Sequence, residues 1–517
     1  MKKRIALLIA PRIQDEFGYT PAGPALVKAS IIKGGHECKI YDLNAELDHY
    51  FFNNREDLVP IDNWFLNHNF YSEKVYKKII ELTNEWVDDI LKYKPTHVGI
   101  SVFSYNSQRA TILLATLIKS RDPNIPIFMG GAGLNTDNNF GPYCLEQKIM
   151  DCWIRGEGEK SVLAYLSGDL KYPGLNGIPP KQIDNINDIE FPDYSDYELS
   201  NYKNKKGLVA LPITGSRGCV RACTFCDIAS IWPKYKFRSG QSIAKEIKTQ
   251  VKKYGAKAFR FTDSLINGSM KAFRDMTYEL AEYRMALPEE DRFIWDSHFI
   301  VRSKNQMPPE DFVKMKESGA GTMLIGVESG SPSVREHMKK GYSDEDLHYS
   351  LLQLFKNNIK VRFLMIIGYP TETEEDFQLT LDFFNRYAEY GKNGLVEEVN
   401  LGLTLNLLPS TPLYDNAEEY GLETTKNHIN DWICIQNPKL DFRERLKRRI
   451  IAQHHVEKLG YKVFESKNYL RALTIAWNEI NNLKNKKITK VDASKIKFDR
   501  EKGALEQKND FDPLRTY

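Results

Sequence analysis

Three closely spaced cysteines are the residues of this sequence best suited to do chemistry. Cys219, Cys223 and Cys226 lie in a glycine-bearing loop that follows the apolar run 208–214. Soft thiolate ligands at such spacing select an iron–sulfur cluster or a zinc ion. Three protein ligands leave one metal position open, and an open position is typical of a catalytic rather than a structural site.

Two other interpretations of these cysteines stay open. They could form a zinc knuckle with a fourth ligand elsewhere, or be three unrelated thiols. The next histidine after Cys226 is His298, which is far away for the fourth ligand of a compact knuckle. Cys144, Cys152 and Cys434 show no paired spacing, so a second cluster has no support in the sequence.

The composition is that of an ordinary globular protein. The chain has 517 residues, enough for several domains, and its net charge of +3 comes from 72 basic and 69 acidic residues. This balance argues against nucleic acid or a membrane surface as the main partner. No apolar run approaches the roughly 20 residues of a membrane span. Seven cysteines, three of them clustered, fit a reducing compartment, so we expect a cytoplasmic protein.

Residues 1–185 alternate between strand-like and helix-like runs. This alternation predicts an α/β domain with a doubly wound parallel sheet. The expected strands are 5–10, 38–41, 98–103, 125–129 and 152–154, and the expected helices are 22–34, 72–93, 107–120 and 158–168. The aromatic-rich stretch 43–71 has no regular pattern and reads as an insertion.

Glycine-bearing turns follow the strands of this first domain. Ligands of such sheets bind outside the carboxyl ends of the strands, where glycines let the backbone approach closely. Each turn taken singly is a strand-to-helix connection. The candidate ligand-binding residues at these ends are Gly23, Ser101, Gly130, Gly131, Gly156 and Glu157.

After a linker over 186–207, alternation resumes with a longer period over 208–414. The expected strands are 208–214, 257–262, 293–301, 321–327, 360–367 and 397–405, and the expected helices are 241–254, 269–286, 308–318, 344–357 and 373–390. Residues 415–517 read as a helical region, with helices at 441–459 and 466–483 and a basic polar tail from 484. We expect that tail to be a solvated chain end.

The cysteine pattern, with Phe225 before the last cysteine, resembles the signature of the radical S-adenosylmethionine (radical SAM) superfamily. The resemblance implies a partial, TIM-like (β/α)6 barrel over 208–414, with the cysteine loop after its first strand. It also implies a [4Fe-4S] cluster whose open iron binds S-adenosylmethionine. One electron, from a donor such as flavodoxin or ferredoxin, would then release a 5′-deoxyadenosyl radical.

Further motifs carry the same resemblance. Gly326-Val-Glu328-Ser-Gly330, followed by Met338-Lys-Lys-Gly341, resembles the fourth-strand run of the family, and Gly368-Tyr-Pro-Thr-Glu372 resembles the turn beside the adenine. The usual Gly-Gly-Glu after the second strand is replaced by Thr-Asp-Ser. The residues implied to contact S-adenosylmethionine are Phe225, Asp263, Ser264, Arg302, Glu328, Ser329 and Gly368.

The first domain resembles the cobalamin-binding domain that precedes many radical SAM barrels. Pro95-Thr-His-Val-Gly-Ile-Ser101, the pair Gly130-Gly131 and Gly156-Glu-Gly-Glu159 carry this resemblance. Cobalamin domains of the methionine-synthase type supply an axial histidine from an Asp-x-His-x-x-Gly motif, which is absent here. The nearest match, Asp296-Ser-His298, lacks the glycine of that motif. The resemblance therefore implies cobalamin without a histidine below it.

Together these features predict a cobalamin-dependent radical SAM enzyme that methylates an unactivated carbon, or phosphorus, of a small-molecule substrate. Radical cyclisation, rearrangement or epimerisation without methyl transfer is the alternative enzyme class. A non-catalytic iron–sulfur sensor is the alternative outside enzymes. Transfer-RNA methylthiolation would need three more cluster cysteines, and Cys38, Cys144 and Cys152 do not resemble that set. No general acid or base is assigned.

Overall fold

The computed structural model describes residues 2–12, 20–52, 73–134, 139–204, 206–402, 404–424 and 432–464. As far as they are described, these residues divide into two compact units. Of the described residues, the first unit comprises those within 2–183 and 188–202, and the second comprises those within 184–187 and 203–464. No described helix is long and apolar enough to cross a membrane.

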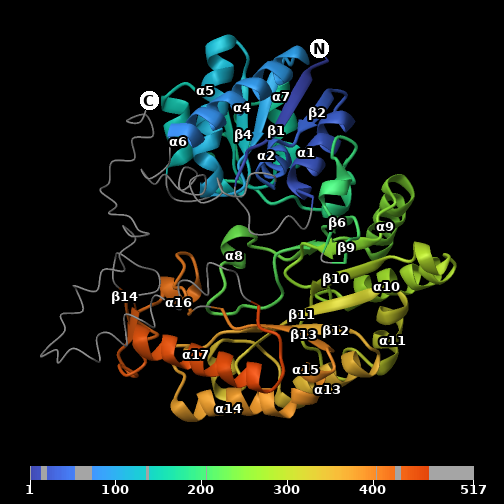
Figure 1. The fold of residues 1–517 in the computed structure, drawn as a ribbon, viewed down its shortest axis with the longest axis vertical. Coiled ribbons are helices and arrows are strands. Elements are labelled where there is room, and N and C mark those ends of the chain that lie inside the picture. Colours follow the sequence, from blue (N-terminus) through green and yellow to red (C-terminus); the bar gives the residue numbers. More distant parts are fainter. Residues whose placement is uncertain are drawn as a thin grey trace, which may run out of the picture. The chain divides into compact units, whose positions relative to one another are not determined.

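The first unit is built on a five-stranded parallel sheet with the order β2-β1-β3-β4-β5 (Figure 1). Its strands are β1 Arg4–Ile9, β2 Glu37–Tyr41, β3 His97–Ser101, β4 Ile127–Gly130 and β5 Cys152–Ile154. This sheet confirms the predicted fold class. Its order reverses between β1 and β3, and ligands of such sheets bind at that reversal.

Both faces of this sheet are covered, as the alternation of its side chains requires. Along β1, Ile5 joins one hydrophobic cluster while Leu8 joins the other. Along β4, Phe128 faces the first cluster and Met129 the second. Successive strand residues point to opposite faces, so a sheet apolar on both sides needs helices on both sides.

The covering helices occur where the sequence predicts them, with two additions. They are α1 Ala22–Lys33, α4 Glu73–Lys92, α5 Gln108–Arg121 and α7 Gly158–Ser167. The additions are α6 Phe140–Glu146 and α2 Leu43–Phe52. The prediction of an irregular stretch was therefore wrong for 43–52, where Leu43 and Leu47 pack into the sheet core. The rest of that stretch, 53–71, lies outside the described residues.

Most of the segment predicted to be a linker packs on the first unit. The buried ammonium of Lys28 donates to Asp196 at 2.6 Å and to Ser195 at 2.7 Å. The hydroxyl of Tyr197 donates to the carbonyl of Pro21 at 3.1 Å, and that of Tyr202 donates to Asp42. Residues 188–202 are therefore an ordered edge of this unit.

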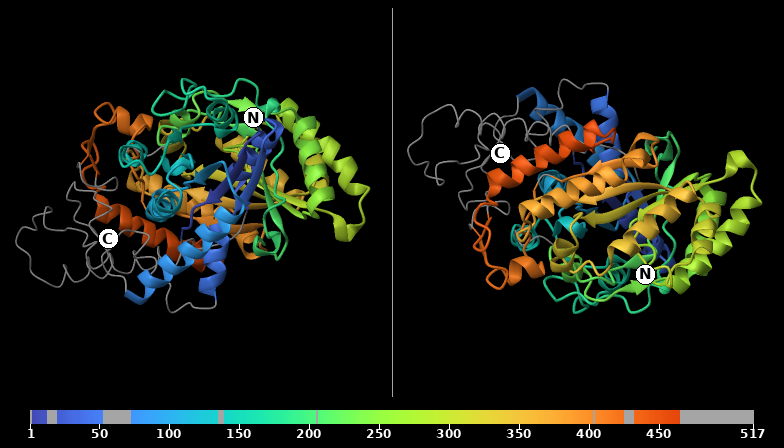
Figure 2. Two further views of the ribbon diagram at one scale, coloured as in Figure 1. Left: turned by 90° about the horizontal axis from the view of Figure 1, so that it is seen from above. Right: turned by 90° about the horizontal axis from the view of Figure 1, so that it is seen from below.

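The second unit contains six parallel strands in sequential spatial order, from β6 to β13 (Figures 1 and 2). They are β6 Ala210–Ile213, β9 Ala258–Phe261, β10 Ile294–His298, β11 Ala320–Glu328, β12 Lys360–Met365 and β13 Val396–Asn400. The connecting helices are α9 Gly240–Tyr254, α10 Met270–Met285, α11 Pro309–Glu317, α12 Pro332–His337, α13 Asp344–Lys356, α14 Glu374–Arg386 and α15 Ala388–Lys392. This is the predicted open (β/α)6 barrel.

The part after the barrel is less helical than the sequence suggests. It contains α16 Pro412–Asp415, α17 Phe442–Lys458 and an antiparallel hairpin of β14 Leu422–Thr424 and β15 Trp432–Cys434. The hairpin contributes Leu422, Trp432 and Cys434 to a hydrophobic cluster. The predicted helix 466–483 and the basic tail lie outside the described residues.

Candidate active site

The cysteine loop is closed at its base by protein contacts. After β6, the strand β7 Ser216–Arg217 pairs antiparallel with β8 Lys236–Phe237. The loop between them carries the three cysteines and the short helix α8 Ile228–Ile231. Gly218 has a φ of +85°, and a Cβ there would lie 2.9 Å from the carbonyl oxygen of Lys234. Glycine is therefore required where the chain enters the loop.

The thiols of the loop are half-buried. The sulfur of Cys219 accepts the backbone N–H of Arg221 at 3.4 Å, and the N–H of Cys226 donates to the carbonyl of Cys223 at 3.2 Å. Burial raises the pKa of Cys223 to about 11, and Lys340 acts in the opposite direction. Burial also raises the pKa of Cys226. Iron binding would overcome these shifts because a coordinated thiol is deprotonated.

Within the described ranges, no three Cys, His, Asp or Glu side chains gather as a site for a metal ion. The surroundings of the cysteines nevertheless suit a larger, anionic cluster. An N–H donor reaches one sulfur, and the charge of Lys340 acts on Cys223. Hydrogen bonds to sulfur, net charge and limited exposure are the features that proteins use around such clusters.

Thr224, inside the cysteine motif, pins the loop to the rest of the barrel. It is fully buried, and its N–H donates to the carbonyl of Met338 at 3.2 Å. Its carbonyl accepts the N–H of Leu413 at 2.8 Å, and its hydroxyl lies 2.9 Å from that of Tyr369. Phe225 packs against the same hydrophobic cluster, which includes Met338, Tyr369 and Leu413. The loop is thus held by the connections after the fourth, fifth and sixth barrel strands.

Glu328 lies beside this loop and is paired with a lysine. Lys340 Nζ is 3.0 Å from Glu328 Oε1, and the two side chains are 13% and 11% exposed. Glu328 has a φ of +64° at a register shift of β11. A Cβ on Gly326 would lie 2.2 Å from Glu328 Oε1 and 3.0 Å from Lys340 Nζ, so this glycine makes room for the ion pair.

Asp263 makes hydrogen bonds within the protein, and its predicted contact with S-adenosylmethionine stays a prediction. Its carboxylate accepts the N–H of Gly215 at 2.9 Å and the hydroxyl of Ser216 at 2.5 Å. Burial raises its pKa to about 7. Asp263 therefore joins the second strand to the base of the cysteine loop. Ser264 follows it and is half-buried.

Arg302 and Ser329 are engaged by the protein itself. The guanidinium of Arg302 donates to the carbonyls of Asn267 at 2.8 Å and Gly268 at 2.9 Å. The hydroxyl of Ser329 is buried, lies 3.2 Å from that of Thr380 and accepts the N–H of Ser331. Both residues hold connections of the barrel, so their predicted contacts with S-adenosylmethionine stay predictions.

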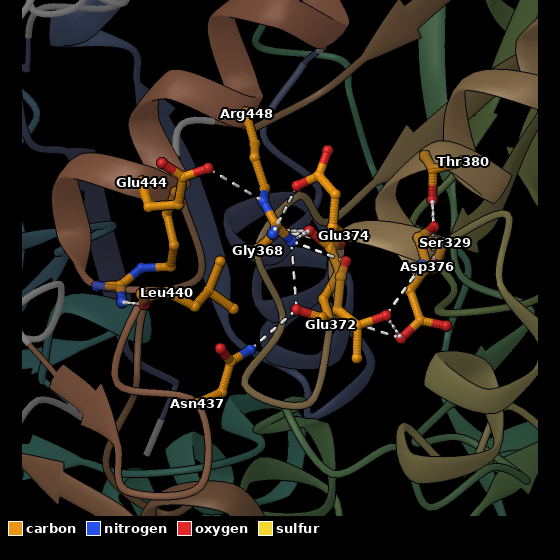
Figure 3. Close-up of polar contacts among 12 residues, drawn as sticks. Ser329, Gly368, Glu372, Glu374, Asp376, Thr380, Asn437, Leu440, Glu444 and Arg448 are labelled. Atoms are coloured by element: carbon orange, nitrogen blue, oxygen red, sulfur yellow. Dashed lines mark hydrogen bonds and ion pairs between the residues drawn. The ribbon is translucent and has the colours of Figure 1, made fainter.

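Gly368 is held in the turn after β12 by an acidic side chain (Figure 3). It has a φ of +79°, and its N–H lies 3.2 Å from both carboxylate oxygens of Glu372. Glu372 is fully buried, and Arg448 on α17 reaches it at 3.0 Å. Arg448 Nη1 also donates to the carbonyl of Thr373 at 2.9 Å. The helix after the barrel thus fixes the turn predicted to flank the adenine.

The face of the second sheet opposite to Phe261 and Trp295 carries residues to which the sequence motifs assign no role. Phe261 and Trp295 contact each other with ring centroids 5.6 Å apart. Asp296 pairs with Arg260 in register, so His298, two residues further along β10, lies in the same row as Arg260, opposite to Trp295. The hydroxyl of Thr262 lies 3.0 Å from that of Thr214. This row of side chains follows from the pairing register of β9 and β10, which the spacing of residues in the sequence does not give.

His298 in this row is a neutral imidazole. Burial and the charge of Arg260 lower its pKa to about 4. Its Nδ1 lies 3.2 Å from the carbonyl oxygen of Asp263. That carbonyl can only accept, so Nδ1 carries the proton and Nε2 carries the lone pair.

The glycine turns of the first unit lie at one edge of its sheet. Ser101 ends β3 and pairs in register with Gly130, the last residue of β4. Gly131 has a φ of +115°, and a Cβ there would lie 2.4 Å from the carbonyl oxygen of Val102. Gly23, in the first turn of α1, has nothing within 4 Å of an added Cβ. Gly131 is therefore required by the turn itself, whereas the contact of this edge with a ligand stays a prediction.

Gly156 and Glu157 have structural contacts in the same unit. A Cβ on Gly156 would lie 2.8 Å from Pro180 Cβ, and the carboxylate of Glu157 accepts the N–H of Ile183. Arg12 and Phe103, which no sequence motif includes, follow β1 and β3. The guanidinium of Arg12 lies 3.7 Å from the ring centroid of Phe103, whose side chain is 55% exposed.

Comparison with known proteins agrees with this geometry. Residues 213–384 match the model of the radical SAM superfamily. An uncharacterized methyltransferase of Pyrococcus horikoshii is 25% identical over 323 residues, 58% of this chain and 67% of the relative. The cytidylyl-2-hydroxyethylphosphonate methyltransferase of Streptomyces wedmorensis is 24% identical over 417 residues, 70% of this chain and 72% of the relative.

The fold also matches a solved structure along most of its length. The radical S-adenosylmethionine methyltransferase TsrM from Kitasatospora setae, with cobalamin and a [4Fe-4S] cluster bound, aligns with a TM-score of 0.60 at 17% identity. The alignment covers 83% of this chain and 82% of TsrM. The barrel unit of this protein therefore contains a radical SAM domain over residues 213–384, and the fold of the chain is similar to that of TsrM.

Proposed function

We propose that this protein is a cobalamin-dependent radical SAM methyltransferase that acts on an unactivated carbon, or on phosphorus, of a small molecule. One observation carries the proposal: the three cysteines lie in a closed loop after β6, the first of six parallel barrel strands. Barrel chemistry collects at the carboxyl ends of the strands. The similarity to two methyltransferases and to TsrM supports methyl transfer as the outcome.

In the barrel unit, Cys219, Cys223 and Cys226 would hold the [4Fe-4S] cluster. Such a cluster supplies the electron that cleaves bound S-adenosylmethionine to methionine and a 5′-deoxyadenosyl radical. Glu328 would meet the cofactor's ribose or amine, as the resemblance of its motif implies, and Lys340 would keep its carboxylate ionised. Gly368 and its turn, held by Glu372, would flank the adenine.

In the first unit, Ser101, Gly130 and Gly131 would lie against cobalamin. An unactivated carbon has no lone pair with which to attack the sulfonium of S-adenosylmethionine. Bound cobalamin would instead supply the methyl group to a carbon radical. Glycines at this edge let the backbone lie close to the flat corrin ring. Arg12 and Phe103 follow the ends of neighbouring strands, β1 and β3, and extend this surface with an exposed aromatic ring.

The proposal includes an electron donor of the flavodoxin or ferredoxin class. It also includes a cytoplasmic location, since the three thiols must stay reduced to bind iron. Methylthiolation fits less well because the remaining thiols of the first unit cannot share a cluster. Cys144 packs in the core on one face of the sheet, and Cys152 packs in the core on the other.

The test uses the whole protein, purified and reconstituted without oxygen, incubated with hydroxocobalamin and desalted. Iron, the corrinoid absorption bands and 5′-deoxyadenosine formed with reductant are measured. We expect about four irons per chain, retained corrinoid and deoxyadenosine. Cys223→Ala should lose iron and deoxyadenosine, whereas Cys38→Ala, which removes a half-buried thiol far from the loop in sequence, should keep both.

Two results would change the proposal. Deoxyadenosine from protein that retains no corrinoid would indicate radical chemistry without cobalamin, such as cyclisation or epimerisation. An intact cluster that yields no deoxyadenosine would refute the radical enzyme and favour a sensor. A product that gains a mass other than one methyl group would also count against methyl transfer.

A further inference from the structure

The Glu328–Lys340 pair is closely packed and largely buried. Its atoms are 3.0 Å apart, and neither side chain is more than 13% exposed. Glu328 adopts a positive φ that a non-glycine residue keeps only when its surroundings enforce it. Gly326 leaves the space that the pair occupies. The ammonium of Lys340 is thus a largely buried charge rather than an exposed surface cation.

The positive end of this pair faces the cysteine loop. Lys340 Nζ lies 5.9 Å from the ring centroid of Phe225. Phe225 lies between Cys223 and Cys226 in the sequence. The N–H of Thr224 bonds to the carbonyl of Met338, which ties the loop to the segment that carries the lysine. Thr224 and Phe225, the two residues in contact with this segment and its lysine, are also the two residues between Cys223 and Cys226.

A cation at this position would matter most for electron transfer. Three thiolates and an oxidised [4Fe-4S] core carry a net charge of −1, and one added electron makes it −2. No bond or proton changes in that step. A fixed positive charge stabilises the reduced form more than the oxidised form, and weak solvent screening enlarges the effect.

We propose that Lys340 raises the reduction potential of the cluster held by Cys219, Cys223 and Cys226, and that Glu328 and Gly326 position its ammonium for this role. The inference rests on the proposed function because it requires that cluster. The inference gives Lys340 a specific role in electron transfer, whereas the resemblance to the family motif implies only that it belongs to a turn. The electron comes from a one-electron, low-potential reductant.

The test measures the midpoint potential of the cluster in the whole protein without S-adenosylmethionine. Reductive titration with titanium(III) citrate is followed by electron paramagnetic resonance. Lys340→Met should lower the ratio of reduced to oxidised cluster at a fixed potential about tenfold, which is ~59 mV for a one-electron couple. Lys340→Arg should stay close to wild type, and Glu328→Gln should shift in the opposite direction.

Two further variants guard the interpretation. Lys339→Met removes an exposed neighbouring charge and should leave the potential unchanged. Lys340→Met leaves the carboxylate of Glu328 buried without its cation. We therefore compare Lys340→Met/Glu328→Gln with Glu328→Gln alone. The double variant should have the lower reduction potential. Equal potentials in that comparison would overturn the inference while leaving the deoxyadenosine assay intact. Wild-type protein that binds no cluster would overturn both this inference and the proposed function.

Discussion

The carboxylate of Asp263 accepts a 2.5 Å hydrogen bond from the hydroxyl of Ser216. A second bond, from the N–H of Gly215 at 2.9 Å, completes the link between β9 and the base of the cysteine loop. Asp263→Ala would leave the buried Ser216 hydroxyl without this acceptor, at a cost of about 1–3 kcal/mol. We expect less iron per chain after reconstitution. Asp291→Ala, at an exposed position, is the matched control.

The same aspartate should make stability depend on pH. Burial raises its pKa from 3.8 to about 7, so the folded state binds the proton more tightly than the unfolded state. Its stabilising contribution is therefore largest below about pH 4 and is lost as the pH rises to about 7. The apparent Tm of wild type minus that of Asp263→Asn should fall across this range and level off above it. A difference that grows with pH would contradict the shift.

Tyr369→Phe should loosen the cysteine loop without changing the shape of its core. The phenol lies 2.9 Å from the buried hydroxyl of Thr224, which would lose this partner. We expect a loss of about 1–2 kcal/mol and faster release of iron to a chelator. Thr224→Val removes the other hydroxyl of the pair. In the double variant it should add little to the loss of stability that Tyr369→Phe causes alone. Fully additive losses would show that the two hydroxyls act independently.

Arg448→Met should weaken the turn that contains Gly368. It leaves the carboxylate of Glu372 buried without its cation, a change that costs about 3–5 kcal/mol in other proteins. The dissociation constant for S-adenosylmethionine, measured by equilibrium dialysis, should rise. Arg448→Met/Glu372→Gln should recover part of the stability. Lys447→Met on the exposed side of α17 should leave the affinity unchanged.

Gly23→Ala separates the predicted cobalamin edge from the stability of its fold. An added Cβ meets nothing within 4 Å, and alanine favours a helix over glycine. The Tm of this variant should therefore stay the same or rise, while retained corrinoid should fall. Gly131→Ala should lower both, because its Cβ would lie 2.4 Å from a backbone oxygen. Unchanged corrinoid retention in Gly23→Ala would remove this residue from the site.

The parallel sheets could be predicted because each strand is a short apolar run followed by a turn and an amphipathic helix. The strand β3 was expected at 98–103 and occurs at His97–Ser101, and α9 was expected at 241–254 and occurs at Gly240–Tyr254. Such local patterns predict the elements correctly because the two-residue period of a strand and the period of about 3.6 residues of a helix depend only on neighbouring residues. The hairpin β14–β15 was missed because its two three-residue strands are too short to show alternation.

The candidate site was predictable only where a motif names the residues. The three cysteines and Glu328 could be chosen from the sequence, but the contact of Glu328 with Lys340 depends on how the chain after β11 folds back. The predicted cofactor contacts of Asp263 and Arg302 stay predictions, but the hydrogen bonds of these side chains to the backbone of Gly215 and Asn267 could not be read from the sequence. A sequence shows that a charged residue follows a strand, but not which partner it meets.

The pairing of β7 with β8 brings the two ends of the cysteine loop together through backbone hydrogen bonds that need no iron. Loop closure is therefore part of folding rather than part of metal capture. The polypeptide should complete its barrel first and receive iron and sulfide afterwards from an assembly scaffold. Oxygen damage that strips the cluster would then leave a refillable protein instead of an unfolded one.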